Sequence, residues 1–108
     1  MEATTELKLK NYNNCLACDA FNYITFAPSR MLSENDLEKV YLVKNDDEYF
    51  FCKIVDVYRC DFWRMPSIAT ISATGMEAHE WREWWIRQHP NTDRKTQMIV
   101  YQYKKIKI

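Results

Sequence analysis

Gly75–Pro90 reads GMEAHEWREWWIRQHP, and after a short polar loop Thr96–Ile106 reads TQMIVYQYKKI. In the first stretch, apolar residues that include Trp81 and Trp85 recur at a spacing of three to four, and charged residues occupy the other side. This spacing is typical of an amphipathic helix with one buried face. The second stretch is rich in β-branched and aromatic residues, as strands are. We therefore expect one main helix at about 76–89 and a final strand after it.

Both ends of this helix are marked in the sequence. Thr74 and Glu77 stand three residues apart, which is the spacing of a capping box at a helix start. Pro90 closes the pattern, because proline cannot continue a helix.

A β-hairpin is expected ahead of the helix. Lys39–Lys44 (KVYLVK) and Glu48–Tyr58 (EYFFCKIVDVY) are β-branched and aromatic, and Asn45-Asp46-Asp47 between them suits a tight turn. Strict alternation along the second arm places Cys52, Ile54 and Tyr58 on one face. Both faces of this arm are largely apolar, which favours a central strand. A further strand, NYITFA, is stopped by Pro28.

Length and composition indicate one folded domain. The chain has 108 residues, 47% of them hydrophobic and 15% aromatic, which is enough material for one core. One glycine and three prolines argue against disorder and against a turn-dense all-β sandwich. We expect a single domain over 15–108, preceded by an N-terminal tail or lead-in strand over 1–14.

Charge and hydropathy limit the partners. Fifteen basic and fifteen acidic residues balance to a formal net charge of zero, so contact with nucleic acid needs a local basic patch. No stretch approaches the roughly 20 apolar residues of a membrane span. The N-terminal MEATTELKLK has acidic residues and no apolar run, unlike a signal peptide. We expect a cytoplasmic protein with no membrane partner.

The metal-ligating and nucleophilic residues do not form a recognisable site. Cys15 and Cys18 make a CxxC, but no second CxxC is present, and the other soft ligands are scattered singly at Cys52, Cys60, His79 and His89. We expect thiols rather than a metal site or a disulfide framework. The two histidines fit the edge and the end of the helix better than acid–base catalysis. A single glycine rules out a P-loop or dinucleotide fingerprint. No cofactor, metal or catalytic residue is predicted.

The segment Tyr58–Pro66, YRCDFWRMP, is the strongest candidate for ligand binding. It interleaves Arg59 and Arg64 with Tyr58, Phe62 and Trp63. Guanidinium groups contact phosphates and aromatic rings stack on bases, so these residue types suit nucleic acid. The alternative is that the aromatic residues cover the end of the sheet and the arginines are only solvated.

Taken in order, the elements between Tyr23 and Ile106 resemble the ASCH domain of the PUA-like superfamily. The most specific part is the stretch containing Gly75, Trp81, Trp85 and Pro90 with the strand that follows. The resemblance implies an α+β fold, a small, mostly antiparallel β-barrel with one main helix. It also implies an association with RNA or modified bases.

One branch of that family consists of amidohydrolases that act on acetylcytidine, and its catalytic set is a lysine, a threonine and a glutamate. Here Cys18–Phe26 contains no lysine and Ile68–Thr74 contains no carboxylate, so Thr25 is the only partial match. Without the lysine and the glutamate no group activates a nucleophile. The activity is therefore not carried over.

We expect a non-catalytic module that binds RNA or a nucleotide-like ligand, including a modified base, in a cleft between barrel and helix. Two alternatives stay open: a protein-interaction domain, such as a phage or mobile-element protein that docks on a host partner, and a divergent nucleoside amidohydrolase. The candidate binding residues are Thr25, Arg30, Tyr58, Arg59, Trp63 and Arg64.

Overall fold

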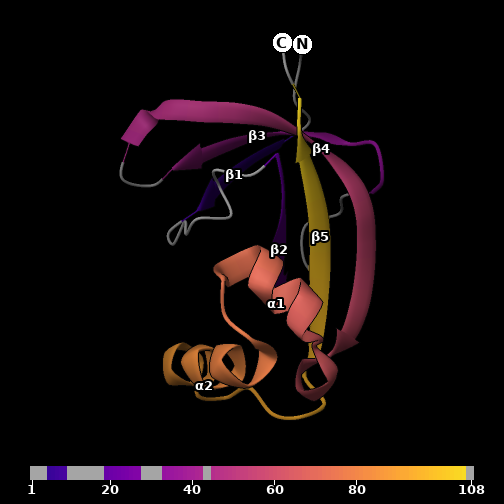
Figure 1. Ribbon diagram of the computed structural model, residues 1–108, viewed down its shortest axis with the longest axis vertical. Helices are drawn as coiled ribbons and strands as arrows, with labels where there is room; N and C mark the ends of the chain where they lie inside the picture. Colours follow the sequence, from indigo (N-terminus) through magenta and orange to yellow (C-terminus); the bar gives the residue numbers. More distant parts are fainter. Residues whose placement is uncertain (1–4, 10–18, 28–32, 43–44, 107–108) are drawn as a thin grey trace.

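The computed structural model describes residues 5–9, 19–27, 33–42 and 45–106. The described strands form one five-stranded sheet in the order β1-β3-β4-β5-β2, which curls into a half-barrel (Figure 1). β1 pairs with β3 in parallel and every other pairing is antiparallel. The predicted α+β, mostly antiparallel architecture is confirmed. The strands are β1 (Thr5–Leu9), β2 (Ala20–Phe26), β3 (Leu37–Leu42), β4 (Asn45–Asp61) and β5 (Gln97–Lys105).

β4 is the long bent strand that curls the sheet. Its first half pairs with β3 as far as Lys53, and its second half pairs with β5 from Cys52 onward. The predicted hairpin is therefore present, but the predicted turn is wrong, because Asn45 already pairs with Leu42 and belongs to β4.

An irregularity at Val55 reverses the faces of β4. Ile54 lies opposite Tyr103 and Asp56 lies opposite Gln102, so Val55 has no partner on β5. An extra residue of this kind bends a strand and breaks its alternation. Cys52 and Ile54 consequently face one side of the sheet and Tyr58 faces the other, so the prediction that the three share a face is wrong.

The sheet carries a core on each face. The barrel core, inside the curl, consists of Phe21, Val40, Cys52, Ile54, Ile99, Tyr101 and Tyr103. The helix core, on the opposite face, consists of Ile24, Phe62, Met65, Ala69, Trp81, Trp85, Met98 and Val100. Successive residues of β5 alternate between the two cores, as side chains of a strand do.

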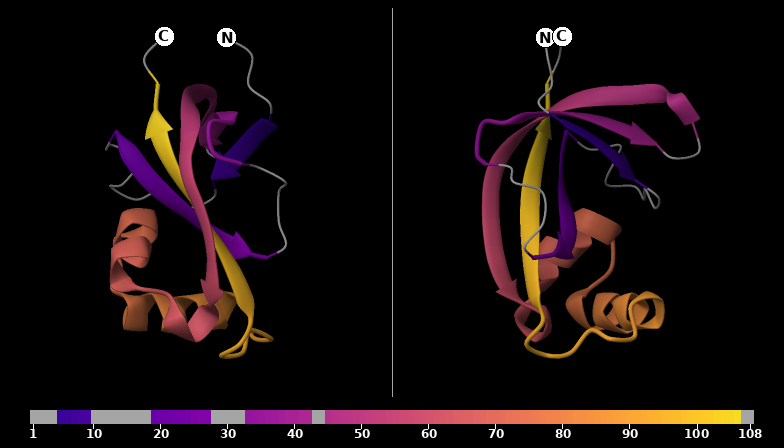
Figure 2. Two further views of the ribbon diagram at one scale, coloured as in Figure 1. Left: turned by 90° about the vertical axis from the view of Figure 1, so that its right-hand side faces the viewer. Right: turned by 180° about the vertical axis from the view of Figure 1, so that it is seen from behind.

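Two helices cover the helix core near the end of β4 (Figures 1 and 2). A short 3₁₀ turn, η2 (Phe62–Arg64), leads from β4 into α1 (Ser67–Thr74), and α2 (Ala78–Gln88) follows. α2 lies within the predicted 76–89 and buries Trp81 and Trp85 as expected. In the described part of the chain, neither helix is long and apolar enough to cross a membrane.

α1 is not among the elements that the sequence predicted. Its sequence, SIATISAT, is rich in β-branched and hydroxyl residues, which have modest helix propensity. Ala69 and Thr70 are nevertheless buried against the sheet, and such packing stabilises short helices more than propensity does.

The predicted capping box of Thr74 and Glu77 is wrong, because the turn between α1 and α2 is built differently. Gly75 ends α1 in the left-handed region, with φ of 79°, which glycine adopts without a steric penalty. Glu77 rather than Thr74 is the residue before α2. The backbone N–H of Ala78 donates to Oγ of Ser67 at 3.0 Å. The first residue of α1 therefore caps the start of α2.

Candidate functional site

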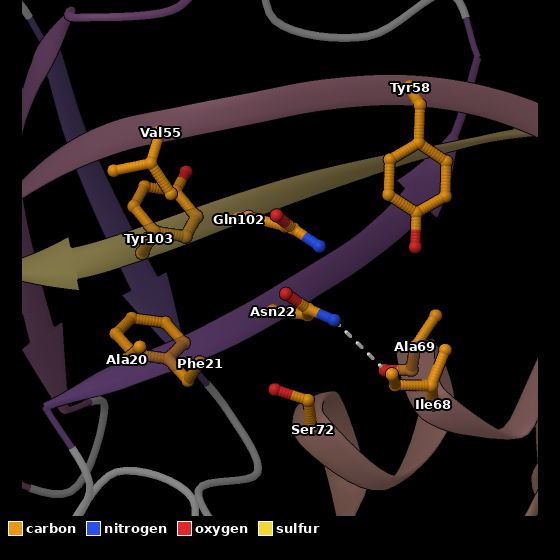
Figure 3. A pocket seen from close by; sticks show the side chains of 10 residues that line it. All are labelled: Ala20, Phe21, Asn22, Val55, Tyr58, Ile68, Ala69, Ser72, Gln102 and Tyr103. Atoms are coloured by element: carbon orange, nitrogen blue, oxygen red, sulfur yellow. Dashed lines mark hydrogen bonds between the residues drawn. The ribbon is translucent and has the colours of Figure 1, made fainter.

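A pocket of about 240 Å³ lies between α1 and the helix face of the sheet (Figure 3). β2, β4 and β5 supply one wall and α1 supplies the other. It is lined by Ala20, Phe21, Asn22, Val55, Tyr58, Ile68, Ala69, Ser72, Gln102 and Tyr103.

Several polar side chains meet in this pocket. The Tyr58 ring reaches from β4 toward the amide of Gln102, and Ser72 lies across the hollow on α1 (Figure 3). Their side chains have no hydrogen-bond partner among the residues that the structure describes. Asn22 differs, because its Nδ2 donates to the carbonyl oxygen of Ala69 at 3.3 Å and so fixes α1 over the sheet.

The pocket is neutral along its described lining, where no residue is charged. Burial raises the pKa of the Tyr58 phenol above its ordinary value, and the nearby Cys60 and Asp56 raise it further. The phenol therefore keeps its proton at neutral pH and can donate a hydrogen bond. Such a pocket suits an uncharged group with polar edges.

The predicted site residues are divided between several places. Tyr58 alone among them lines the pocket. Thr25 and Arg59 both lie opposite Ile99, and directly paired residues share a face, so these two point to the barrel side. Arg30 lies outside the described residues.

Trp63 and Arg64 lie on η2 and are exposed. The sequence placed Trp63 beside Arg59 and Arg64, but the arginines that contact it come from elsewhere in the chain. The guanidinium carbon of Arg82, on α2, lies 4.8 Å from the centroid of the Trp63 ring, and that of Arg94 lies 4.4 Å from it. Nη1 of Arg82 also donates to the carbonyl oxygen of Trp63 at 3.3 Å.

Sequence reasoning missed the pocket residues Ser72 and Gln102. Gln102 did carry a signal, because it interrupts the apolar run MIVYQY in β5. Buried polar groups usually have hydrogen-bond partners, so a polar residue in such a run is a candidate for a ligand contact when the protein supplies none. Ser72 gave no signal, because α1 itself was not predicted.

The described metal-ligating residues offer one cluster, at the start of α2. Ligand atoms of Glu77, His79 and Glu80 lie within 4.8 Å of one another, and all three side chains are exposed. Nδ1 of His79 lies 3.7 Å from Oε2 of Glu77. Acidic residues at this position favourably complement the helix dipole, which accounts for them without a metal.

The described thiols are poor nucleophiles. Burial raises the pKa of Cys52 to about 12, and burial also raises the pKa of Cys60. Since the thiolate is the reactive form, neither thiol is activated. Cys15 and Cys18 lie outside the described residues.

No protein-family model and no curated protein sequence matches the chain. Two solved structures share its fold. The ASCH domain from Lactobacillus crispatus JV V101 is similar over 95% of this chain and 80% of its own, with a TM-score of 0.66 and 10% identity. Protein EF3133 from Enterococcus faecalis V583, with the family model DUF984, is similar over 86% of this chain and 64% of its own, with a TM-score of 0.65 and 5% identity. The chain thus has an ASCH-type fold, as the resemblance in sequence predicted.

Proposed function

We propose that the protein is a binding module for RNA or a nucleotide-like ligand, and that the pocket between α1 and the sheet receives the base. One observation carries the proposal. Tyr58, Ser72 and Gln102 present unpartnered polar groups between apolar walls. Small-molecule sites have this composition, with an apolar lining and a few placed polar groups that fix orientation.

The size of the pocket favours a single base. Its volume of about 240 Å³ is below the roughly 300–1,000 Å³ of pockets that hold drug-sized ligands. Val55 and Ile68 offer apolar surface for the faces of a ring. The Gln102 amide both donates and accepts, which matches the edge of a nucleobase. Unpaired RNA bases are recognised in this way, by packing on their faces and hydrogen bonds at their edges.

The chemistry of the described lining favours binding over catalysis. It includes no carboxylate, imidazole or amine, the groups that most often serve as general acid or base. The phenol of Tyr58 is held in its protonated form. The proposal therefore stays with a non-catalytic module, which the ASCH-type fold supports through the RNA association that the family resemblance implies.

Of the residues predicted from sequence, the proposal keeps Tyr58 in the base pocket and Trp63 and Arg64 on the adjoining surface. Arg64 has no ion-pair partner in the described part of the chain, so its charge is available to a ligand. Thr25 and Arg59 receive no role here, because they lie on the other face of the sheet.

The test is calorimetric titration with nucleosides, plain and base-modified, on the wild type and on Gln102→Ala. Loss of one hydrogen bond to the base should weaken binding by about tenfold. Gln88→Ala is the matched control, because Gln88 is exposed on α2 and outside the pocket lining. The proposal fails if no nucleoside binds the wild type, or if both variants lose the same affinity.

A further inference from the structure

We infer that Trp63, Arg82 and Arg94 form a phosphate-binding site for a single RNA strand. The inference rests on the proposed function, since it supplies the backbone contacts for a strand whose base enters the pocket. It assigns the contacts to two arginines that are distant in sequence from the Tyr58–Pro66 segment.

The geometry holds both cations on one ring. The guanidinium carbons lie 4.8 Å and 4.4 Å from the same indole centroid, within the range of cation–π attraction. Trp63 is 48% exposed, so the cluster lies at the surface. A guanidinium that rests on a ring is preorganised, and less conformational entropy is lost when it binds a ligand.

The charge of the two arginines is not neutralised by the described protein. Neither has a carboxylate oxygen within ion-pair distance among the described residues. Asp93, beside Arg94, instead accepts bonds from Lys95 N at 2.8 Å and Thr96 Oγ1 at 3.3 Å.

The acidic groups on the neighbouring elements also leave the two arginines without an ion pair in the described part of the chain. Asp61, at the end of β4, accepts from Nε2 of Gln97, and Glu77 faces His79. Glu80 and Glu83 on α2 make no ion pair with a described arginine. Two uncompensated guanidinium groups on one exposed ring are arranged to receive an anion.

Phosphate is the anion that this arrangement suits best. The guanidinium presents a planar fork of N–H donors that matches two phosphate oxygens. Each of the two guanidinium groups can bind one phosphate, and a strand supplies several phosphates whereas a free anion supplies one.

The cluster is also within reach of the pocket. Tyr58 and Trp63 are five residues apart, so their Cα atoms are separated by at most about 18 Å. Small single-strand-binding domains cover roughly 4–16 nucleotides, which spans this distance. η2 joins the two, because β4 leads into it and α1 begins three residues after it ends.

The experiment is a salt titration of a fluorescein-labelled, single-stranded RNA octamer followed by anisotropy. Arg82→Gln/Arg94→Gln is compared with the charge-matched control Arg87→Gln/Lys104→Gln, whose residues are exposed and do not contact Trp63. Loss of two phosphate contacts should lower the slope of log affinity against log salt by about 1.4. At about 0.1 M salt the affinity should fall on the order of tenfold to thirtyfold. The control should keep the wild-type slope, and a DNA octamer shows whether the ribose contributes.

Nucleosides separate this inference from the proposed function. They lack phosphate and should bind the arginine variant as they bind the wild type. If nucleosides bind but RNA keeps its salt slope in the arginine variant, the phosphate site is overturned and the base pocket stands. If RNA binding depends on the arginines but no nucleoside binds, the phosphate site stands and the base pocket fails.

Three results overturn the inference directly: equal losses in the arginine variant and its control, no RNA binding at low salt, or competition by polyglutamate as effective as that by unlabelled RNA. The last would identify the surface as a site for an acidic protein partner.

The variant Arg82→Lys/Arg94→Lys is the control for misfolding, because it preserves both charges. It should retain the salt slope while losing part of the affinity, since lysine lacks the planar fork. Thermal unfolding of each variant is measured in parallel.

Discussion

At the scale of single residues, ionisable groups are buried in the barrel core and beside it. Glu38 and Cys52 are both 0% exposed. The hydroxyl of Tyr103 donates to Oε1 of Glu38 at 2.6 Å, so the buried carboxyl group has a hydrogen-bond partner. The thiol of Cys52 stays neutral, since burial is the main cause of its raised pKa, with Glu38 adding to the effect and Lys105 opposing it.

The raised pKa of Cys52 predicts a loss of stability in alkali. In the unfolded chain the thiol loses its proton near its ordinary pKa of 9.0, whereas in the folded protein burial raises that pKa to about 12. Between these values the folded state binds more protons, so the free energy of unfolding falls as pH rises. The slope from this group is at most about 1.4 kcal/mol per pH unit.

Urea unfolding of the wild type and Cys52→Ala between pH 8 and 11 measures this slope. The variant is less stable at every pH because it leaves a cavity, but its stability should fall less steeply above pH 9. Tyr58 and Cys60, whose pKa values are also raised, are present in both proteins, so the difference isolates Cys52. Parallel curves would contradict the prediction.

At the scale of elements, α1 has a structural role through Ser67 and, in the proposed function, a binding role through Ser72. Oγ of Ser67 accepts the N–H of Ala78 and so caps α2, whereas Ser72 lines the pocket and has no described hydrogen-bond partner. Ser67→Ala should lower the free energy of unfolding by about 0.5–2 kcal/mol and leave nucleoside affinity unchanged. Ser72→Ala should weaken nucleoside binding severalfold with little effect on stability.

Each serine variant is the control for the other, because both make the same substitution on one helix. Chemical unfolding and nucleoside titration of the two proteins give four values. If Ser72→Ala is the more destabilising variant, or if Ser67→Ala is the one that loses affinity, the assignment of roles within α1 is wrong.

The elements also show how much the sequence could predict. α2 was predictable because Trp81 and Trp85 repeat on one helical face, a purely local signal. α1 was not, because its residues have modest helix propensity and are held in place by packing against a sheet formed from distant segments. The irregularity at Val55 was invisible for a related reason, since which residue is left unpaired depends on the register with β5.

In the candidate site, too, the sequence predicted what a local signal marks and missed what only tertiary structure brings together. Tyr58 was predicted and lines the pocket, but the neighbours chosen for it were its neighbours in sequence. Ser72 and Gln102, and likewise Arg82 and Arg94 around Trp63, are brought together only by tertiary structure. A local motif could thus identify one ring that lines the pocket without identifying the residues around it.

At the scale of the whole molecule, the two cores share strands and should unfold together. β5 contributes Ile99, Tyr101 and Tyr103 to the barrel core and Met98 and Val100 to the helix core. The four tryptophans of the chain all lie in η2 and α2, outside the barrel core. Tryptophan fluorescence therefore reports on the helix side, whereas far-UV circular dichroism reports on the whole sheet.

Ile54→Val, in the barrel core, tests this coupling from the face that carries no described tryptophan. Removal of one buried methyl group should cost about 1 kcal/mol and lower the midpoint of thermal unfolding by roughly 4–8 °C. Because β5 cannot leave one core without leaving the other, the fluorescence midpoint should fall by the same amount as the dichroism midpoint. Val55→Ala, at a position 40% exposed, is the control and should change stability by less than about 0.5 kcal/mol. A fluorescence midpoint that stays at the wild-type value while the dichroism midpoint falls would show that the two faces unfold independently.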